Sequence, residues 1–105
     1  MTPRELQKLI RCGENSLVQF KEQFTSQKQI AAEMSAFSNS RGGTILFGVH
    51  DKTGEITGLS YRQIQRVSED LGNAASEHVR PSIYVTTETV EGSRIEGALC
   101  GSESP

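Results

Sequence analysis

"AFSNSRGGTILFGVHDKTGEITG", the stretch from Ala36 to Gly58, contains the element around which a sheet can form. It begins with the small residues of a helix end, continues through a turn with two glycines into an apolar strand, and ends in a polar turn. The apolar part, Ile45–Val49, is not strictly alternating, which is typical of a strand buried on both faces. Gly42 and Gly43 precede that strand and allow positive φ and close backbone approach. The corner that they form can therefore reverse the chain or hold an anion.

Further strands are expected on both sides of this central one. Alternating or apolar segments predict strands over residues 16–24, 44–50, 55–58, 82–90 and 94–100. The segment at 16–24 places Val18 and Phe20 on one face and Gln19 and Lys21 on the other.

Three helices are predicted between and before these strands. Thr2, Ser26 and Ser60 each stand three positions before a Glu or Gln, which is the pattern of a capping box. Apolar residues at spacings of three and four follow each box. Gly13 and Pro81 are expected to end the first and third helices.

The predicted fold class is α+β, in the order α-β-α-β-β-α-β-β. We expect a mixed sheet of four to five strands with three helices packed on one side. Residues 1–95 are expected to form the domain, and residues 96–105 a disordered or truncated tail.

The composition favours a globular domain over a disordered or membrane-spanning protein. Hydrophobic residues make up 34% and charged residues 23% of the chain, which is typical of a soluble globular domain. No apolar run approaches the ~20 residues of a membrane span, and the first residues lack a signal-peptide core. We therefore expect a cytoplasmic protein without a membrane partner. Cys12 and Cys100 have no metal-site spacing and are expected to be free thiols.

Charge is unevenly distributed along the chain. The formal net charge is −2, which argues against a strong nonspecific nucleic-acid binder acting alone. Residues 1–45 nevertheless contain six Lys or Arg and four Asp or Glu, so a local basic surface is compatible with the sequence.

Five motifs in order resemble a known family. They are Gly13-Glu14, Gln19-Phe20-Lys21, the run from Ala36 to Gly43, Phe47-Gly48-Val49 with Asp51, and Gly54 with Ile56 and Gly58. Together, over about residues 1–95, they resemble the Schlafen-type Alba-like domain. The resemblance implies the fold of that domain and the DNA-binding module of a transcriptional regulator. It also implies a second possibility, because related Schlafen domains cut structured RNA at a metal-dependent acidic site.

The chain departs from the family pattern at two places. Gln19 stands where the family usually has Glu, and the segment from Ile95 to Gly101 differs from the family's last strand. Some family members have been labelled ATP-binding, but the sequence contains no Walker-type phosphate-binding loop.

The first functional hypothesis is a nucleic-acid interface that contacts mainly backbone phosphates, with DNA favoured over RNA. A homodimer would double this surface, and no cofactor is expected. The alternative roles are ordinary solvated cations and, for the glycine corner, a Schellman-type helix end. The candidate residues are Lys21, Lys28, Asn39, Arg41, Gly42 and Gly43.

Two other hypotheses belong to different classes. A metal-dependent ribonuclease would use Glu14 and Asp51, with His50 nearby, to hold Mg²⁺ or Mn²⁺. Gln19 weakens this hypothesis, because an amide brings no charge to the cation, and we expect a binding module rather than an enzyme. The third hypothesis is a protein-interaction module that docks through its sheet edge or its slim second helix. Salt-dependent DNA binding separates the first from the third, and metal-dependent RNA cleavage identifies the second.

Overall fold

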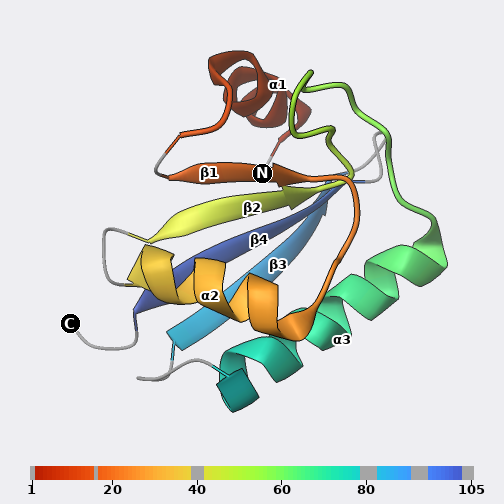
Figure 1. Cartoon of the computed structure of the whole chain (residues 1–105). Coiled ribbons are helices and arrows are strands. Elements are labelled where there is room, and N and C mark those ends of the chain that lie inside the picture. Colours follow the sequence, from red (N-terminus) through yellow and green to blue (C-terminus); the bar gives the residue numbers. More distant parts are fainter. Residues whose placement is uncertain (1, 16, 39–41, 79–82, 91–94, 103–105) are drawn as a thin grey trace.

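The computed structural model describes residues 2–15, 17–38, 42–78, 83–90 and 95–102. Within these residues the chain is a small mixed α/β domain with three helices and four strands (Figure 1). In chain order they are α1 (Pro3–Cys12), β1 (Val18–Lys21), α2 (Gln27–Ser38), β2 (Gly43–Phe47), α3 (Tyr61–His78), β3 (Ile83–Val90) and β4 (Ile95–Ser102).

The sheet has the strand order β1-β2-β4-β3. β1 and β2 are parallel, and β4 is antiparallel to both of its neighbours. The last strand of the chain therefore lies inside the sheet, where Gly97 is opposite Leu46 of β2 and Glu88 of β3. Residues 96–102 thus belong to the sheet. This agrees with the strand that we predicted over residues 94–100 and contradicts the tail that we expected over residues 96–105. Pairing on two sides outweighs the low strand propensity of the glycines in this segment.

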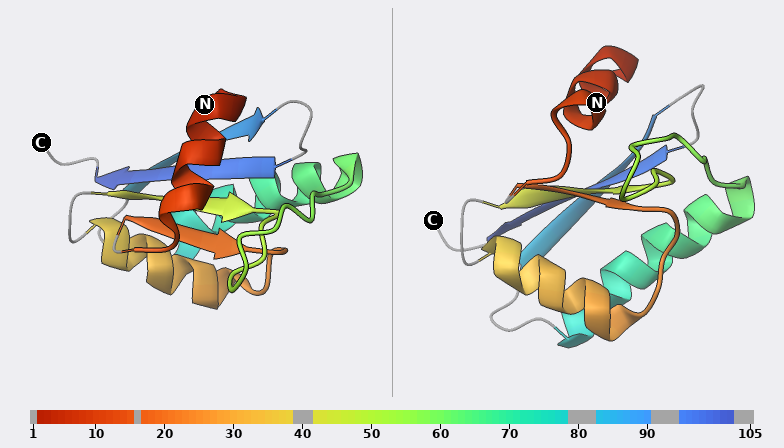
Figure 2. Two further views of the ribbon diagram at one scale, coloured as in Figure 1. Left: turned by 90° about the horizontal axis from the view of Figure 1, so that it is seen from above. Right: turned by 45° about the horizontal axis from the view of Figure 1, so that its top comes forward.

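Helices cover both faces of the sheet. α2 and α3 pack with Ile45 and Phe47 on one face, whereas Leu6 of α1 packs with Leu46 and Val49 on the other. Figure 2 shows α1 across the sheet from α2 and α3. The expectation that all helices lie on one side is therefore wrong for α1. The physical reason is that β2 is apolar on both faces, so each face needs a cover.

The predicted helix starts are confirmed. In each capping box the hydroxyl oxygen accepts a hydrogen bond from a backbone N–H three residues later: Glu5 to Thr2 at 3.2 Å, Gln29 to Ser26 at 3.1 Å and Gln63 to Ser60 at 3.1 Å. At the end of α1, Gly13 has φ 79° and its N–H donates to the carbonyl of Ile10.

The return strand predicted at residues 55–58 is reduced to one bridge, between Val49 and Ile56. Gly48 has φ 102°, which interrupts the strand conformation after β2. Its N–H and that of Val49 both donate to the carbonyl of Lys21, at 2.7 and 3.1 Å. This irregular pairing coincides with the end of β1 at Lys21, short of the predicted limit at residue 24.

The structure also bears on the cysteines and on the length of the apolar helices. Cys12 is a free, exposed thiol as expected, whereas the side chain of Cys100 lies outside the described residues. In the part of the chain that the structure describes, no helix has the length and apolarity needed to cross a bilayer.

Candidate nucleic-acid interface

The glycine corner ends helix α2. Gly42 has φ 86°, a left-handed conformation that favours glycine, and its N–H donates to the carbonyl of Phe37 at 2.8 Å. This bond connects Gly42 to the last turn of α2, which ends at Ser38. Asn39 and Arg41 of the predicted site lie outside the described residues.

Gly43 has a different role from its neighbour. A Cβ placed on Gly43 would overlap the ring of Phe37, which is buried between α2 and the sheet. Only a residue without a side chain lets β2 begin this close to α2. The two glycines are thus explained by helix termination and by packing, and an anion contact is an additional role that this geometry does not require.

Lys21 of the predicted phosphate-binding strip is paired within the protein. Its Nζ lies 2.7 Å from Oε1 of Glu33 on α2, and the two side chains are 21% and 17% exposed. Gln19 points to the same carboxylate: with the amide oriented by its surroundings, its nitrogen donates to both oxygens of Glu33 at 3.1 Å. The burial pattern of β1 confirms that Gln19 and Lys21 share a face opposite Val18 and Phe20.

This pairing changes what Lys21 can offer to a phosphate. The Glu33 carboxylate already neutralises the ammonium group, so a phosphate would compete with an intramolecular partner. Lys28, in contrast, is exposed in the first turn of α2.

Glu14, a candidate metal ligand, accepts a backbone hydrogen bond. Its Oε2 receives the N–H of Phe20 at 3.0 Å. Because β1 is an edge strand, that N–H points away from β2, and the carboxylate satisfies a donor that would otherwise face outward.

Asp51, the other candidate ligand, lies in a different group. Possible ligand atoms of Glu22, His50 and Asp51 are within 4.8 Å of one another, and Glu14 does not belong to this group. Nδ1 of His50 accepts the N–H groups of Lys52 and Thr53 at 3.1 and 3.3 Å. Its Nε2 lies 3.2 Å from Oε1 of Glu22.

These contacts define the role of His50 in the turn. A nitrogen that accepts two N–H groups carries no proton, so in the neutral ring Nε2 holds the proton and donates it to Glu22. Neither ring nitrogen is then free for a cation. His50 thus stabilises the turn that follows it.

Helix α1 presents cations that our site prediction did not include. Arg4, Lys8 and Arg11 are exposed and follow one another at spacings of four and three, which places them on one face of the helix. Among the described residues, none of the three side chains has a hydrogen bond or ion pair. We call these three residues the α1 basic face. The same spacing rule that identified the apolar stripe of α1 could have identified it from the sequence.

Known proteins resemble the chain in fold and in sequence. The crystal structure of the DIP2311 protein from Corynebacterium diphtheriae is similar with a TM-score of 0.58 and 16% identity, over 96% of this chain and 22% of that one. A protein of Ureaplasma parvum serovar 3, named an uncharacterized ATP-binding protein, is 36% identical over 77 residues. These cover 70% of this chain and 22% of the relative, so the chain spans only a small part of either protein.

A family model matches the part of the chain that contains most of the sheet and the helices α2 and α3. The model of the Schlafen AlbA_2 family matches residues 14–96, from the loop before β1 to the beginning of β4. The matched range includes Gln19, the glycine corner and Asp51, whereas α1 precedes it. By this match, which covers most of its length, the chain belongs to the Schlafen AlbA_2 family.

Proposed function

We propose that the chain is a nucleic-acid-binding module that contacts backbone phosphates mainly through the α1 basic face. The observation that carries this proposal is that Arg4, Lys8 and Arg11 are exposed, share a face and lack partners among the described residues. Family membership agrees with it, because the family resemblance that we noted in the sequence implies nucleic-acid binding.

The dimensions of the α1 basic face suit a phosphate backbone. Arg4 and Arg11 are seven residues apart in one helix, and at ~1.5 Å per residue that is about 10 Å along its axis. One strand of B-DNA carries about three phosphates over such a length. Three cations can therefore each approach a phosphate.

DNA fits this helix better than double-stranded RNA. The major groove of B-DNA is ~12 Å wide and admits an α-helix. The major groove of A-form RNA is too narrow for side chains to enter. Among the described residues, α1 is the only helix on its face of the sheet (Figure 2), so α2 and α3 do not obstruct a groove placed over it. The loop at Gly54 lies on the same face and packs against Ile10 of α1.

The whole chain remains acidic, which limits its affinity. With a net charge of −2, one copy would bind DNA weakly in the cytoplasm. A homodimer would present two basic faces and roughly double the number of phosphates contacted. We include dimerisation in the proposal for this reason.

The test compares two matched double variants. Lys8→Gln with Arg11→Gln removes two charges from the α1 basic face. Lys28→Gln with Arg62→Gln removes two exposed charges from the opposite layer. Duplex DNA binding is measured by fluorescence anisotropy at several salt concentrations. The first variant should lower the slope of log affinity against log salt by about two, and the second should leave it unchanged.

If only the Lys28→Gln, Arg62→Gln variant lowers the slope, the interface lies on the layer of α2 and α3. That layer contains Lys28, which we predicted from the sequence as a phosphate contact. Equal slopes for both variants and the natural chain would contradict the proposal. The ribonuclease hypothesis gains no support here, since Glu14 and His50 are engaged in other contacts.

A further inference from the structure

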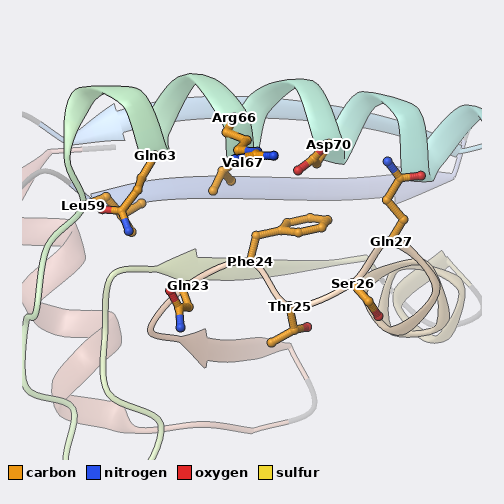
Figure 3. Close-up of a pocket in the computed structure, with 10 residues that line it drawn as sticks. All are labelled: Gln23, Phe24, Thr25, Ser26, Gln27, Leu59, Gln63, Arg66, Val67 and Asp70. Atoms are coloured by element: carbon orange, nitrogen blue, oxygen red, sulfur yellow. The ribbon is translucent and has the colours of Figure 1, made fainter.

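A pocket of about 470 Å³ lies between the loop that joins β1 to α2 and the first half of α3 (Figure 3). Pockets that hold small ligands have volumes of roughly 300–1,000 Å³. None of this pocket's lining residues belongs to α1, to the glycine corner or to the group of Glu22, His50 and Asp51. Its lining residues are Gln23, Phe24, Thr25, Ser26, Gln27, Leu59, Gln63, Arg66, Val67 and Asp70.

The pocket has an aromatic and aliphatic floor. Phe24 is half-buried, and its ring stacks on that of Phe47 with centroids 6.1 Å apart and planes 27° apart. Leu59 and Val67 are buried beside it. Figure 3 shows the Phe24 ring in the middle of the pocket, below the side chains of α3. A flat ligand can stack on the ring from the pocket side.

Two opposite charges project from α3 over this floor. Arg66 and Asp70 are four residues apart, and Figure 3 shows both side chains on the side of α3 that faces Phe24. Among the described residues neither has an ion pair or a hydrogen bond. Arg before Asp is the weaker order for an ion pair at this spacing.

The pocket therefore combines the paired N–H donors of the Arg66 guanidinium, the carboxylate acceptor of Asp70 and the aromatic face of Phe24. Guanine matches this combination. Its O6 and N7 accept the two parallel hydrogen bonds of an arginine. Its N1–H and N2–H₂ are adjacent donors for a carboxylate. Adenine has a donor beside N7 and lacks the donor pair that Asp70 would accept from, so it satisfies neither charged group fully.

We propose that this pocket binds a guanine base, stacked on Phe24, with Arg66 on the O6 and N7 edge and Asp70 on the N1 and N2 edge. The base can belong to a free mononucleotide or to a single strand of nucleic acid. The proposal does not depend on the α1 basic face, which lies across the sheet.

The first experiment titrates the natural chain with GMP and with AMP, followed by isothermal calorimetry and NMR chemical shifts. GMP should bind at least about tenfold more tightly than AMP. Asp70→Asn should abolish most of this preference. Glu69→Gln, the same loss of charge at the preceding exposed position, should retain it. Arg66→Gln and its control Arg62→Gln form a second matched pair on the same helix.

The second experiment separates the two sources of the base. A uridine hexamer with one central guanine should bind better than one without it if the base is taken from a strand. If the chain binds GMP but binds the two hexamers with equal affinity, the pocket is a site for a free nucleotide. The Lys8→Gln, Arg11→Gln variant should keep its GMP affinity even if its duplex binding fails.

Several results would overturn the proposal. They are the absence of saturable GMP binding at millimolar concentration, equal affinity for AMP, and an unchanged preference in a folded Asp70→Asn variant. Circular dichroism establishes that each variant is folded before its affinity is compared.

Discussion

Gly43 lacks a side chain at the one place where the ring of Phe37 fills the space of a Cβ. Gly42, one residue earlier, is explained instead by its φ of 86°. The sequence shows two adjacent glycines without distinguishing these causes, because a steric overlap depends on a residue of the preceding helix. Chain reversal and close packing are separate requirements that here fall on neighbouring residues.

Gly43→Ala should therefore destabilise the domain. The new methyl group must displace the Phe37 ring, which we expect to lower the free energy of unfolding by about 1–3 kcal/mol. Urea denaturation followed by circular dichroism measures this change. Gly72→Ala is the matched control: a Cβ there meets no atom within 4 Å in the middle of α3. It should raise stability by about 0.5–1 kcal/mol. A stable Gly43→Ala variant would show that the ring can move without cost.

At the scale of elements, β1 and α2 are joined by a polar contact as well as by apolar packing. Glu33 of α2 receives the Lys21 ammonium group at 2.7 Å and the Gln19 amide at 3.1 Å. The contact contains one cation and one anion, and the neutral amide completes it. This explains why Gln is suitable at position 19 in this chain.

Gln19→Glu should destabilise the β1–α2 contact at neutral pH. Two carboxylates would then face one ammonium group, and their repulsion would raise the pKa of one carboxyl in the folded state. A raised folded pKa stabilises the folded state at low pH, and this advantage is lost as pH rises. The melting temperature of the variant should thus be below that of the natural chain at pH 7, with a smaller difference at pH 5.

Two measurements extend this test of position 19. Mn²⁺ should raise the melting temperature of Gln19→Glu and leave the natural chain unchanged, since a cation can replace the missing positive charge. Gln29→Glu, at an exposed position of α2, is the control for the added charge. Equal stability of Gln19→Glu and the natural chain at pH 7 would contradict the contact that we describe.

Elements whose signals are local could be predicted from the sequence. The capping boxes at Thr2, Ser26 and Ser60 identify each helix start from four residues, and all three form as expected. The face of the sheet on which α1 packs could not be predicted. An apolar stripe indicates that a helix packs against another element, but it does not indicate which face of the sheet that is. The same limit applied to the site: nothing near Lys21 in sequence indicates that Glu33 neutralises it.

At the scale of the molecule, the sheet separates two candidate surfaces. The α1 basic face lies on one side, and the pocket beside α3 lies on the other (Figure 2). No residue belongs to both, so substitutions at the two surfaces should have independent effects on binding. Phosphate contact and base contact, if both occur, are then separate in this domain.

The sheet itself depends on the last strand of the chain. β4 pairs with β2 through residues 96–100 and with β3 through residues 95–102, so it connects the two halves of the sheet. Without it β3 has no strand partner within the described residues, and β2 has an open edge. The helices α2 and α3, which pack with Ile45 and Phe47, would then face an incomplete sheet.

A chain that ends at residue 95 should therefore fail to fold, whereas one that ends at residue 102 should retain the fold. The first truncation removes nearly all of β4, and the second removes only residues 103–105. Loss of an inner strand forfeits its hydrogen bonds on both sides, and a small domain with about 5–15 kcal/mol of stability cannot absorb that loss. Circular dichroism and the cooperativity of thermal unfolding distinguish the outcomes. A cooperative transition in the shorter chain would mean that residues 96–102 are the dispensable tail expected from the sequence, and that β2 and β3 find another partner.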